Sequence, residues 1–282
     1  KSGNWMLYGS RDYSKLSTGE WEHCPENRQA AISPIRGQGL LNFEGDCVVR
    51  ERIDVVFPVL HGENGEDGTI QGLLQLAGIP YVGPHVAASA VAMDKTLTKL
   101  VADNAGIPQA AWQLVRRGSL DTRLESTLDA LEKRFAYPMF VKPAGTGSSV
   151  GVSKAKSRQA LEEASKFDDK VLVEEFICGK EIEVAVMGNE SPVASVCGEI
   201  DSGVEFYDYD AKYITDTSVA YIPARICEEA SEQVRDMAVK VYRAIGCQGL
   251  SRVDFFVTDE GKVVFNEINT IPGFTSISMY PK

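Results

Sequence analysis

The chain has 282 residues, which is enough for about two domains whose hydrophobic core needs no disulfide or metal for support. Its 40 acidic residues outnumber the 29 basic ones, and the formal net charge is −11. Such a chain has no net positive field to attract phosphate backbones, so we expect no nucleic-acid partner and no anionic membrane as partner. With 44% apolar and 24% charged residues, the composition is that of a folded globular protein.

The cysteines and the apolar runs indicate the cellular localisation of the protein. The six cysteines are scattered, without a CxxC pair or the spacing of a zinc site. In a chain of this length, this pattern is typical of reduced thiols in the cytosol. No apolar run approaches the ~18 residues of a membrane span, and residues 1–8 lack the apolar core of a signal peptide. The sequence therefore predicts a cytoplasmic protein.

The first part of the chain predicts loops followed by one βαβ unit. Residues 1–52 carry several turn signals and are expected to be rich in loops. Residues 53–60 form a continuous apolar run typical of a buried parallel strand. An amphipathic helix is expected over residues 70–77, followed by a short strand over residues 79–82. Because ligands bind at the carboxyl ends of such strands, the Gly-rich stretch 61–68 is a candidate ligand loop.

Further along the chain, helical and strand-like patterns alternate. The periodicity predicts helices from Asp94 to Gly106, over residues 124–135 and over residues 228–245. It predicts strands over residues 137–141, 171–176 and 183–187. The fold class is therefore mixed α/β.

Two alternating runs near the end of the chain predict a hairpin. Residues 250–258 and 262–269 are separated by Asp259-Glu260-Gly261, a turn signal. A two-residue turn at Glu260-Gly261 places Asp254 opposite Glu267 and Arg252 opposite Asn269, with all four side chains on one face. The other face is expected to be core and carries Val253, Phe255, Val257, Val264 and Ile268, with Asn266 as a polar exception. A bulged three-residue turn would shift the facing pairs by one.

The polar face of this hairpin has the composition of a magnesium site. Asp254, Glu267 and Asn269 supply oxygen atoms, and Arg252 adds a positive charge for a neighbouring anion. Mg²⁺ prefers oxygen ligands and is usually shared with substrate phosphates. The alternative interpretation is a ladder of cross-strand ion pairs on a solvent-exposed face.

A second candidate anion site lies at residues 145–151, which read GTGSSVG. Glycines let backbone N–H groups approach an anion, and Ser148 and Ser149 add hydroxyl donors. A flexible hairpin tip is the alternative. Lys142, which closes an apolar strand just before this stretch, favours an anion because a lysine is rarely placed there without a partner.

Carboxylates and aromatic residues could serve a nucleotide. Glu174 ends a predicted strand and Glu181 follows, and carboxylates accept hydrogen bonds from an adenine amino group and from ribose hydroxyls. Solvated acidic residues are the alternative. Residues 206–213 form an aromatic and acidic loop with Lys212, either a lid or a loop anchored to the core. His61 alone is most simply a structural histidine.

Together these segments resemble the D-alanine–D-alanine ligases of the ATP-grasp superfamily. The matching stretches are PVLHGENGEDGTIQG (58–72), MDK (93–95), VKPAGTGSSVG (141–151), EEFICGKEIEVAV (174–186), FYDYDAKY (206–213), SRVDFF (251–256) and NEINTIPGFTSISMYP (266–281). The resemblance implies an ATP-grasp architecture in three parts. These are an N-terminal α/β Rossmann-like (pre-ATP-grasp) domain over residues 1–93, a central subdomain over residues 94–176, and a C-terminal subdomain over residues 177–282 with the magnesium site and a lid loop.

The resemblance implies an ADP-forming ligase that makes D-alanyl-D-alanine for peptidoglycan precursors. The carboxylate of one D-alanine attacks the γ-phosphate of ATP to give an acyl phosphate, and the amine of a second D-alanine then attacks the activated carbonyl. The resemblance also implies ATP as a substrate, two Mg²⁺ ions as cofactors with Mn²⁺ as an alternative, and a homodimer.

The resemblance also implies a role for each site residue. The magnesium ligands are Asp254, Glu267 and Asn269. The ATP-binding residues are Lys95, Lys142, Glu174, Phe176, Ile177, Glu181, Lys212 and Asn266. The catalytic residues are Arg252, Gly273, Ser148 and Tyr213, of which Arg252 and the Gly273 N–H form an oxyanion hole. The D-alanine-binding residues are His61, Ser278 and Met279.

The chain departs from the family pattern at both ends, and two alternative functions stay open. The family's first strand with its Gly-rich turn does not precede Trp5, and its last helix does not follow Pro281, so we expect activity from the full-length protein. One alternative is a resistance-type ligase for D-serine or, less readily, D-lactate. Tyr213 argues against D-lactate, and Met279 favours D-alanine because resistance-type ligases tend to carry arginine there. The other alternative is a non-catalytic nucleotide-binding module, against which the intact metal set argues.

Overall fold

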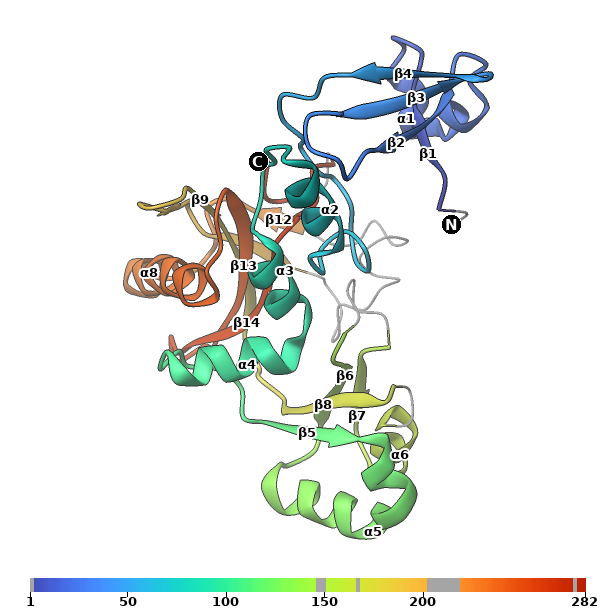
Figure 1. Ribbon diagram of the computed structural model, residues 1–282. Coiled ribbons are helices and arrows are strands. Elements are labelled where there is room, and N and C mark those ends of the chain that lie inside the picture. The colour runs from blue at the N-terminus through green and yellow to red at the C-terminus, as the bar shows by residue number, and fades with distance from the viewer. Residues whose placement is uncertain (1–2, 146–150, 166–167, 202–218, 276–277) are drawn as a thin grey trace. The chain divides into compact units, whose positions relative to one another are not determined.

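The computed structural model describes residues 3–145, 151–165, 168–201, 219–275 and 278–282 (Figure 1). The chain divides into two compact units, of which the first comprises Lys1–Phe57 and Ile70–Val82. The second comprises Pro58–Thr69 and Gly83–Lys282. No helix in the described ranges is both long enough and apolar enough to cross a membrane. All six cysteines are free thiols.

The first unit contains an antiparallel sheet where the sequence predicted loops, so that prediction for residues 1–52 was wrong. The strands lie in the order β1-β2-β3-β4 and are β1 (Trp5–Leu7), β2 (Arg28–Ile32), β3 (Leu40–Glu44) and β4 (Cys47–Glu51). The short helices α1 (Ser14–Thr18) and η1 (Glu20–His23) lie between β1 and β2. All five residues of β4 are exposed, so this strand lacks the alternation of buried and exposed residues by which sequence patterns reveal strands.

The apolar run over residues 53–60 was predicted to be a buried strand, but most of it is not paired in the described part of the chain. Val56 forms an isolated parallel bridge with Tyr81, and its N–H donates to the carbonyl of Pro80 at 2.9 Å. Val55 and Phe57 are exposed. A buried parallel strand needs neighbours along its length, and in the described residues the backbone of the run pairs with the segment after helix α2 (Thr69–Ala77) through this bridge.

The second unit contains a larger sheet with strands in the order β12-β11-β9-β13-β14, and β10 pairs with β9. Its strands are β9 (Lys180–Met187), β10 (Val193–Ala194), β11 (Gly198–Asp201), β12 (Val219–Tyr221), β13 (Leu250–Val257) and β14 (Val263–Asn269). The accompanying helices are α3 (Val86–Met93), α4 (Lys95–Asn104) and α8 (Glu228–Ile245). Helices α8 and α3 contact the sheet, while α4 packs on α3 and α8 (Figure 1).

Helix α8 confirms the prediction for residues 228–245 and builds most of the core of this sheet. Its buried residues form one stripe: Ala230, Val234, Ala238, Val241, Tyr242 and Ile245. The helix ends at Gly246, whose φ of 80° is the left-handed conformation that glycine adopts without strain. The buried Tyr242 hydroxyl donates a hydrogen bond to the carbonyl of Gly188 at 2.7 Å, so its polar end is satisfied.

The β13–β14 hairpin has the predicted pairs far from its turn, but two irregularities produce them. Asp254 faces Glu267 and Arg252 faces Asn269. At the turn, the Thr258 N–H donates to the Lys262 carbonyl at 3.0 Å, so the loop has three residues and shifts the nearby pairs by one. Between Asp254 and Phe255 the register shifts again, and the extra residue of this β-bulge is Asn266.

The bulge changes which residues of β14 face the core. Val263, Phe265 and Ile268 join the cluster that packs on α8, and Val264 does not. Val264 is buried as predicted (1% exposed), but it pairs with Phe256 and so lies on the opposite face. The predicted face was wrong because alternation was counted through an unrecognised bulge. The bulge also explains the polar exception, since Asn266 accepts a hydrogen bond from Lys142 at 3.2 Å on the other face.

The smaller sheet of the second unit has its own core. Its strands lie in the order β5-β8-β6-β7 and are β5 (Trp112–Arg116), β6 (Met139–Pro143), β7 (Ser153–Ala155) and β8 (Lys170–Glu175). Helices α5 (Arg117–Arg134) and α6 (Arg158–Ser165) cover it. The fully buried side chains of this core include Leu128, Leu131, Met139, Val141 and Leu161.

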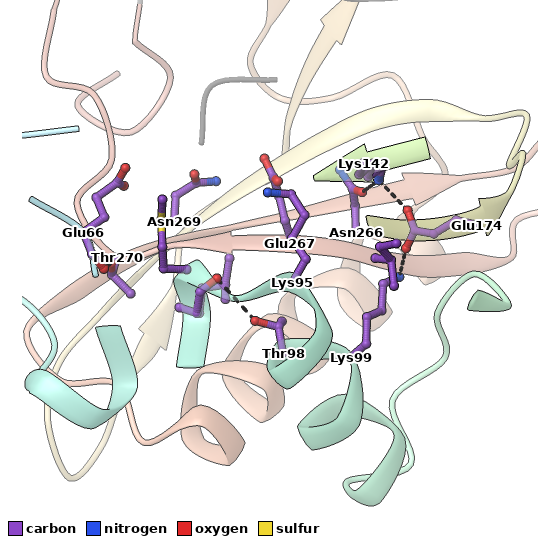
Figure 2. Close-up of a pocket in the computed structure, with 14 residues that line it drawn as sticks. Glu66, Lys95, Thr98, Lys99, Lys142, Glu174, Asn266, Glu267, Asn269 and Thr270 are labelled. Carbon is purple, nitrogen blue, oxygen red and sulfur yellow. Dashed lines mark hydrogen bonds and ion pairs between the residues drawn. The ribbon is translucent and has the colours of Figure 1, made fainter. Parts of the chain in front are cut away.

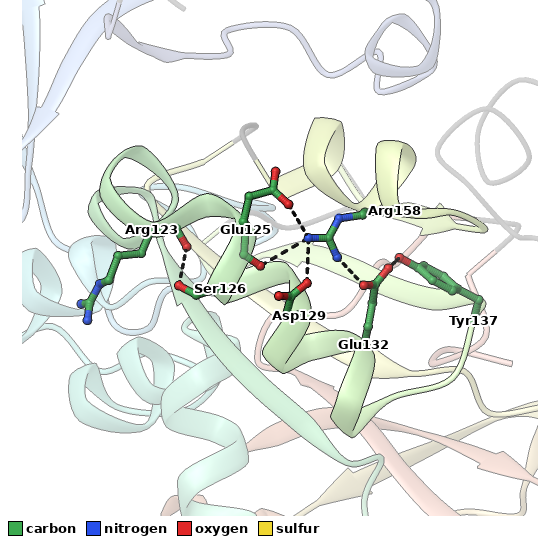
Figure 3. Close-up of polar contacts among 7 residues, drawn as sticks. All are labelled: Arg123, Glu125, Ser126, Asp129, Glu132, Tyr137 and Arg158. Carbon is green, nitrogen blue, oxygen red and sulfur yellow. Dashed lines mark hydrogen bonds and ion pairs between the residues drawn. The ribbon is translucent and has the colours of Figure 1, made fainter.

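An ion-pair network joins α6 to α5 at the surface (Figure 3). Arg158, the first residue of α6, pairs with Glu125 at 2.7 Å, with Asp129 at 2.9 Å and with Glu132. These three carboxylates share one face of α5 because they are three or four residues apart. The Tyr137 hydroxyl donates to Glu132 at 2.8 Å. Since the carboxylates of Glu125 and Asp129 are exposed, the network fixes the orientation of α6 more than it stabilises the fold.

We expect Leu128→Ala to destabilise the smaller sheet by ~2–5 kcal/mol, because it leaves a cavity where a fully buried side chain packed. Leu100→Ala on α4, whose side chain is 51% exposed, is the matched control and should cost no more than about 0.5 kcal/mol. Urea unfolding followed by circular dichroism measures both. Equal losses for the two variants would contradict the described core.

Candidate functional site

Three neighbouring strands of the larger sheet carry polar side chains on the face opposite α8. The register places Asp254 of β13 between Glu183 of β9 and Glu267 of β14. One pair further along, Arg252 faces Asn269. Because side chains alternate along a strand, these residues share a face while Val253, Phe255 and Val257 pack in the core. The predicted metal residues and the predicted catalytic arginine are thus brought together.

Arg252 and Asp254 form a bidentate pair at the centre of this face. Arg252 Nε lies 2.8 Å from Asp254 Oδ1, and a terminal nitrogen of Arg252 lies 2.7 Å from Oδ2. Glu183 is a further partner, 3.3 Å from Arg252 Nε. Burial by itself would lower the pKa of Arg252, but the charges of Asp254 and Glu183 raise it well above its ordinary value. The guanidinium is therefore a permanent positive charge.

The residues around Asp254 fit a hard divalent cation. Asn269 donates through Nδ2 to Asp254 at 2.9 Å, which leaves its amide oxygen for another ligand. Within the described ranges no three His, Cys, Asp or Glu side chains gather as a metal site, and the amide of Asn269 offers a further oxygen beside Asp254. Two carboxylates and an amide suit Mg²⁺, which completes its shell with water and phosphate oxygens.

The N-terminus of α4 positions Lys95 at the same site. Asp94 caps the helix by accepting from two backbone N–H groups of its first turn, at 2.9 and 3.2 Å. Asp94 also pairs with Lys170 at the start of β8. The Lys95 N–H donates to the carbonyl of Ala144 at 3.0 Å. Lys95 and Glu267 line the same cavity (Figure 2).

A buried group of two lysines and one carboxylate lies at the end of β8. Glu174 Oε1 lies 2.5 Å from Lys99 Nζ, and Oε2 lies 2.6 Å from Lys142 Nζ (Figure 2). Burial by itself would raise the pKa of Glu174, but the charges of Lys142 and Lys99 lower it to about 2. Burial lowers the pKa of Lys99, and the Glu174 charge opposes that effect. Lys142 has a raised pKa because Glu174 outweighs its burial.

A cavity of ≈ 520 Å³ adjoins these lysines. Its apolar lining includes Ala110, Phe140, Val152, Phe176, Ile177, Phe256 and Phe265, and its polar lining includes Glu181. The rings of Phe140 and Phe176 lie 5.9 Å apart, and Lys154 Nζ lies 4.1 Å from the centre of the Phe176 ring. Aromatic walls at one end and ammonium groups at the other suit a planar base that carries phosphates.

The segment after β14 gathers the residues predicted to bind D-alanine. His61 Nδ1 lies 3.1 Å from the carbonyl oxygen of Ile271. A Cβ atom at Gly273 would lie 2.5 Å from Ser278 Oγ, so the backbone at Gly273 lies close to the Ser278 side chain. Met279 is buried, and its sulfur would lie 2.7 Å from a Cβ atom at Gly198. Ser148, Lys212 and Tyr213 lie outside the described residues.

Two residues at the site were missed by the sequence analysis. Lys99 lies four residues after Lys95 and therefore on the same face of α4, a spacing that could have revealed it. Glu66 lines the cavity that contains Glu267, and its Oε2 accepts from the Gly62 N–H at 2.7 Å. Burial raises the pKa of Glu66. Its position within the stretch 58–72 was the available signal.

Two family models together match most of the chain. The model described as "D-ala D-ala ligase N-terminus" matches residues 1–84. The model described as "D-ala D-ala ligase C-terminus" matches residues 101–282. Among curated relatives, the D-alanine–D-alanine ligase of Acetivibrio thermocellus is 51% identical, over 100% of this chain and 79% of that protein. That of Caldicellulosiruptor bescii is 46% identical, over 100% of this chain and 78% of that protein.

Solved structures agree with these matches. The crystal structure of VanG D-Ala:D-Ser ligase from Enterococcus faecalis has a TM-score of 0.87 and 39% sequence identity, and covers 99% of this chain and 81% of that one. The structure of the D-alanine–D-alanine ligase from Coxiella burnetii has a TM-score of 0.82 and 36% identity, and covers 99% of this chain and 75% of that one. The mixed α/β prediction is confirmed.

The lowered pKa of Glu174 predicts a pH-dependent contribution to stability. Because the folded state lowers this pKa from 4.5 to about 2, the contribution is complete above the unfolded value and is lost as the pH falls between the two. Glu174→Gln should therefore lower the free energy of unfolding by roughly 3 kcal/mol near neutral pH. The difference in the free energy of unfolding between Glu174→Gln and the wild type should become smaller as the pH falls below the unfolded pKa of 4.5.

Urea unfolding at several pH values measures this difference. Glu175→Gln, the same substitution at the next and partly exposed position of β8, is the control and should cost less. A loss at Glu174 that stays constant from neutral to strongly acidic pH would contradict the buried ion-pair group.

Proposed function

We propose that this chain, which belongs to the D-alanine–D-alanine ligase family, joins two molecules of D-alanine with ATP to give D-alanyl-D-alanine for peptidoglycan precursors. Members of this family are ATP-dependent ligases. The observation that carries the proposal is the hairpin register, which sets Asp254 opposite Glu267 and Arg252 opposite Asn269. This arrangement supplies oxygen donors and a fixed positive charge at one place, as a reaction between ATP and a carboxylate requires.

ATP would bind in the cavity beside the larger sheet. Phe176 and Ile177 would enclose the base, and Glu174 and Glu181 would accept from its amino group and from the ribose hydroxyls. Lys95 and Lys142 would hold the phosphates, with Asn266 orienting Lys142 through their 3.2 Å hydrogen bond. From the family resemblance we assign a third cation, Lys212, to the same phosphates.

Asp254, Glu267 and Asn269 would hold two Mg²⁺ ions, with Mn²⁺ as an alternative. When bound, the ions neutralise negative charge on the phosphates during phosphoryl transfer. Support comes from the oxygen-only donor set and from the burial of Asp254, which is 8% exposed. Within this site the Asn269 amide orients the Asp254 carboxylate.

The remaining residues would serve the formation of the peptide bond. Arg252 and the Gly273 N–H would stabilise the negative oxygen of the tetrahedral intermediate, at ~3 kcal/mol for each donor. Ser278 and the Met279 N–H would bind the carboxylate of the second D-alanine. His61 would lie near the first D-alanine.

From the family resemblance, we assign Ser148 and Tyr213 to a hydrogen-bond network near the first D-alanine. Tyr213 belongs to the stretch that matches the family's lid loop. Closure of such a loop protects an acyl phosphate from water.

We further propose a division into domains over residues 1–93, 94–176 and 177–282. The separate hydrophobic cluster of the smaller sheet supports the central part. A homodimer follows from the resemblance alone. The acidic charge and the free thiols support a cytoplasmic protein without nucleic-acid or membrane partners.

D-serine is the second candidate for the acceptor substrate. The VanG structure, titled a D-Ala:D-Ser ligase, is 39% identical to this chain with a TM-score of 0.87. Met279 supports D-alanine instead, since it stands where resistance-type ligases tend to carry arginine. The acceptor assay below distinguishes the two.

The full-length protein is expected to release phosphate from ATP only when D-alanine and Mg²⁺ are both present. A coupled assay for ADP, with D-alanine as first substrate, compares D-alanine, D-serine and D-lactate as acceptors. Turnover should be fastest with D-alanine, because Met279 favours it over D-serine and D-lactate has no amine to act as the nucleophile. Faster turnover with D-serine would favour the alternative, and no D-alanine-dependent phosphate release would contradict the proposal.

Glu267→Ala should reduce D-alanine-dependent phosphate release at least ~100-fold, since loss of even an outer partner of a metal ligand costs ~10–100-fold. Glu260→Ala, the same substitution in the turn of the same hairpin, is the matched control and should keep wild-type turnover. The assay is repeated over a range of Mg²⁺ concentrations. Unchanged phosphate release in Glu267→Ala would refute the metal assignment.

A further inference from the structure

Helix α4 carries a second lysine that has no role in the proposed reaction. Lys99 lies one turn after Lys95, and its side chain is 3% exposed. Its Nζ lies 2.5 Å from Glu174 Oε1, and the Glu174 side chain is also 3% exposed. Lys142 approaches the other oxygen at 2.6 Å. Figure 2 shows the two lysines reaching the carboxylate from opposite sides.

Glu174 faces two lysines, and further carboxylates act on the same lysines: Glu267 and Glu181 favour the charged form of Lys142, and Asp103 favours that of Lys99. A single lysine would neutralise Glu174, and that lysine would then have little charge left for another anion. With two lysines, each carboxylate oxygen of Glu174 has its own partner, so Lys142 keeps part of its charge for a bound anion.

The geometry indicates that Lys142 presents this charge. The Lys142 side chain is 15% exposed, whereas the Lys99 side chain is 3% exposed. Lys142 also donates to Asn266 on β14, the strand of the predicted metal ligand Glu267. Both lysines border the cavities, but Lys142 is the more exposed of the two and is therefore the ammonium that a bound anion reaches more easily, while Lys99 is almost fully buried against the carboxylate.

We propose that Lys99 is a positioning residue for ATP: it holds one oxygen of Glu174, so that Lys142 stays available to the phosphates of the nucleotide. This inference rests on the proposed ATP-dependent function. It assigns Lys99 no contact with the nucleotide. Its effect passes through Glu174, and this distinguishes it from a further phosphate-binding lysine.

The test compares three variants of the full-length protein: Lys99→Met, Glu174→Gln and the double variant. Phosphate release with D-alanine is measured over a range of ATP concentrations. Lys99→Met should raise the KM for ATP by about tenfold or more and change kcat by less than about threefold, as expected for loss of ground-state binding. In the Glu174→Gln background, adding Lys99→Met should change the KM by less than about twofold, because no carboxylate remains to be held.

Controls separate this role from a structural one. Lys133→Met, at an exposed position of α5, should keep the wild-type KM. The double variant should melt at a higher temperature than Glu174→Gln, because it lacks an unpaired buried ammonium. The double variant and Glu174→Gln can therefore be compared even if Lys99→Met alone does not fold.

Two results would overturn the inference. One is a wild-type KM in Lys99→Met, and the other is a KM in the double variant several-fold above that of Glu174→Gln, which would make Lys99 a direct nucleotide ligand. Failure of the proposed function would give a different result, namely no D-alanine-dependent turnover in the wild type. Calorimetric titration with ADP gives the same comparison as dissociation constants, so the inference is tested even without turnover.

Discussion

The alternation of side chains along β13 is the constraint on which the site depends. One face of the strand packs Val253, Phe255 and Val257 on α8, and this fixes the strand in the core. The other face must then present Arg252 and Asp254 beside the neighbouring strands. Polar groups are thus held by backbone pairing and by packing behind them, which costs little reorganisation when charge develops in a reaction.

The β-bulge in β14 sets the register that places the proposed metal ligands opposite each other. A three-residue turn alone would leave Asp254 opposite a different residue of β14. The extra residue Asn266 restores the pairing with Glu267 and turns its own amide toward Lys142. A local irregularity of the sheet therefore supplies both the register of the proposed metal ligands and a contact that orients a lysine.

The parts of the fold that depend on strong local sequence signals could be predicted. The parts that depend on contacts between residues distant in sequence could not. The apolar stripe of α8 and the start of α4 at Asp94 depend only on residues close in sequence, and both helices were predicted. The sheet of the first unit and the exposed Val55 depend on strand partners, which periodicity does not contain. The spacing from Lys95 could have placed Lys99 on the same face of α4, but its pairing with a residue of β8 depends on a strand distant in sequence.

Helix α4 connects the two sheets of the second unit through charges at both ends of β8. Asp94 pairs with Lys170 at the start of that strand, and Lys99 pairs with Glu174 near its end. The helix itself packs on α3 and α8, which contact the larger sheet. A displacement of the smaller sheet relative to the larger one must therefore either carry α4 along or break a buried ion pair. Carrying α4 along would break its packing on α3 and α8, so this packing and the ion pairs together keep the lysines of α4 and the carboxylate of β8 in one arrangement.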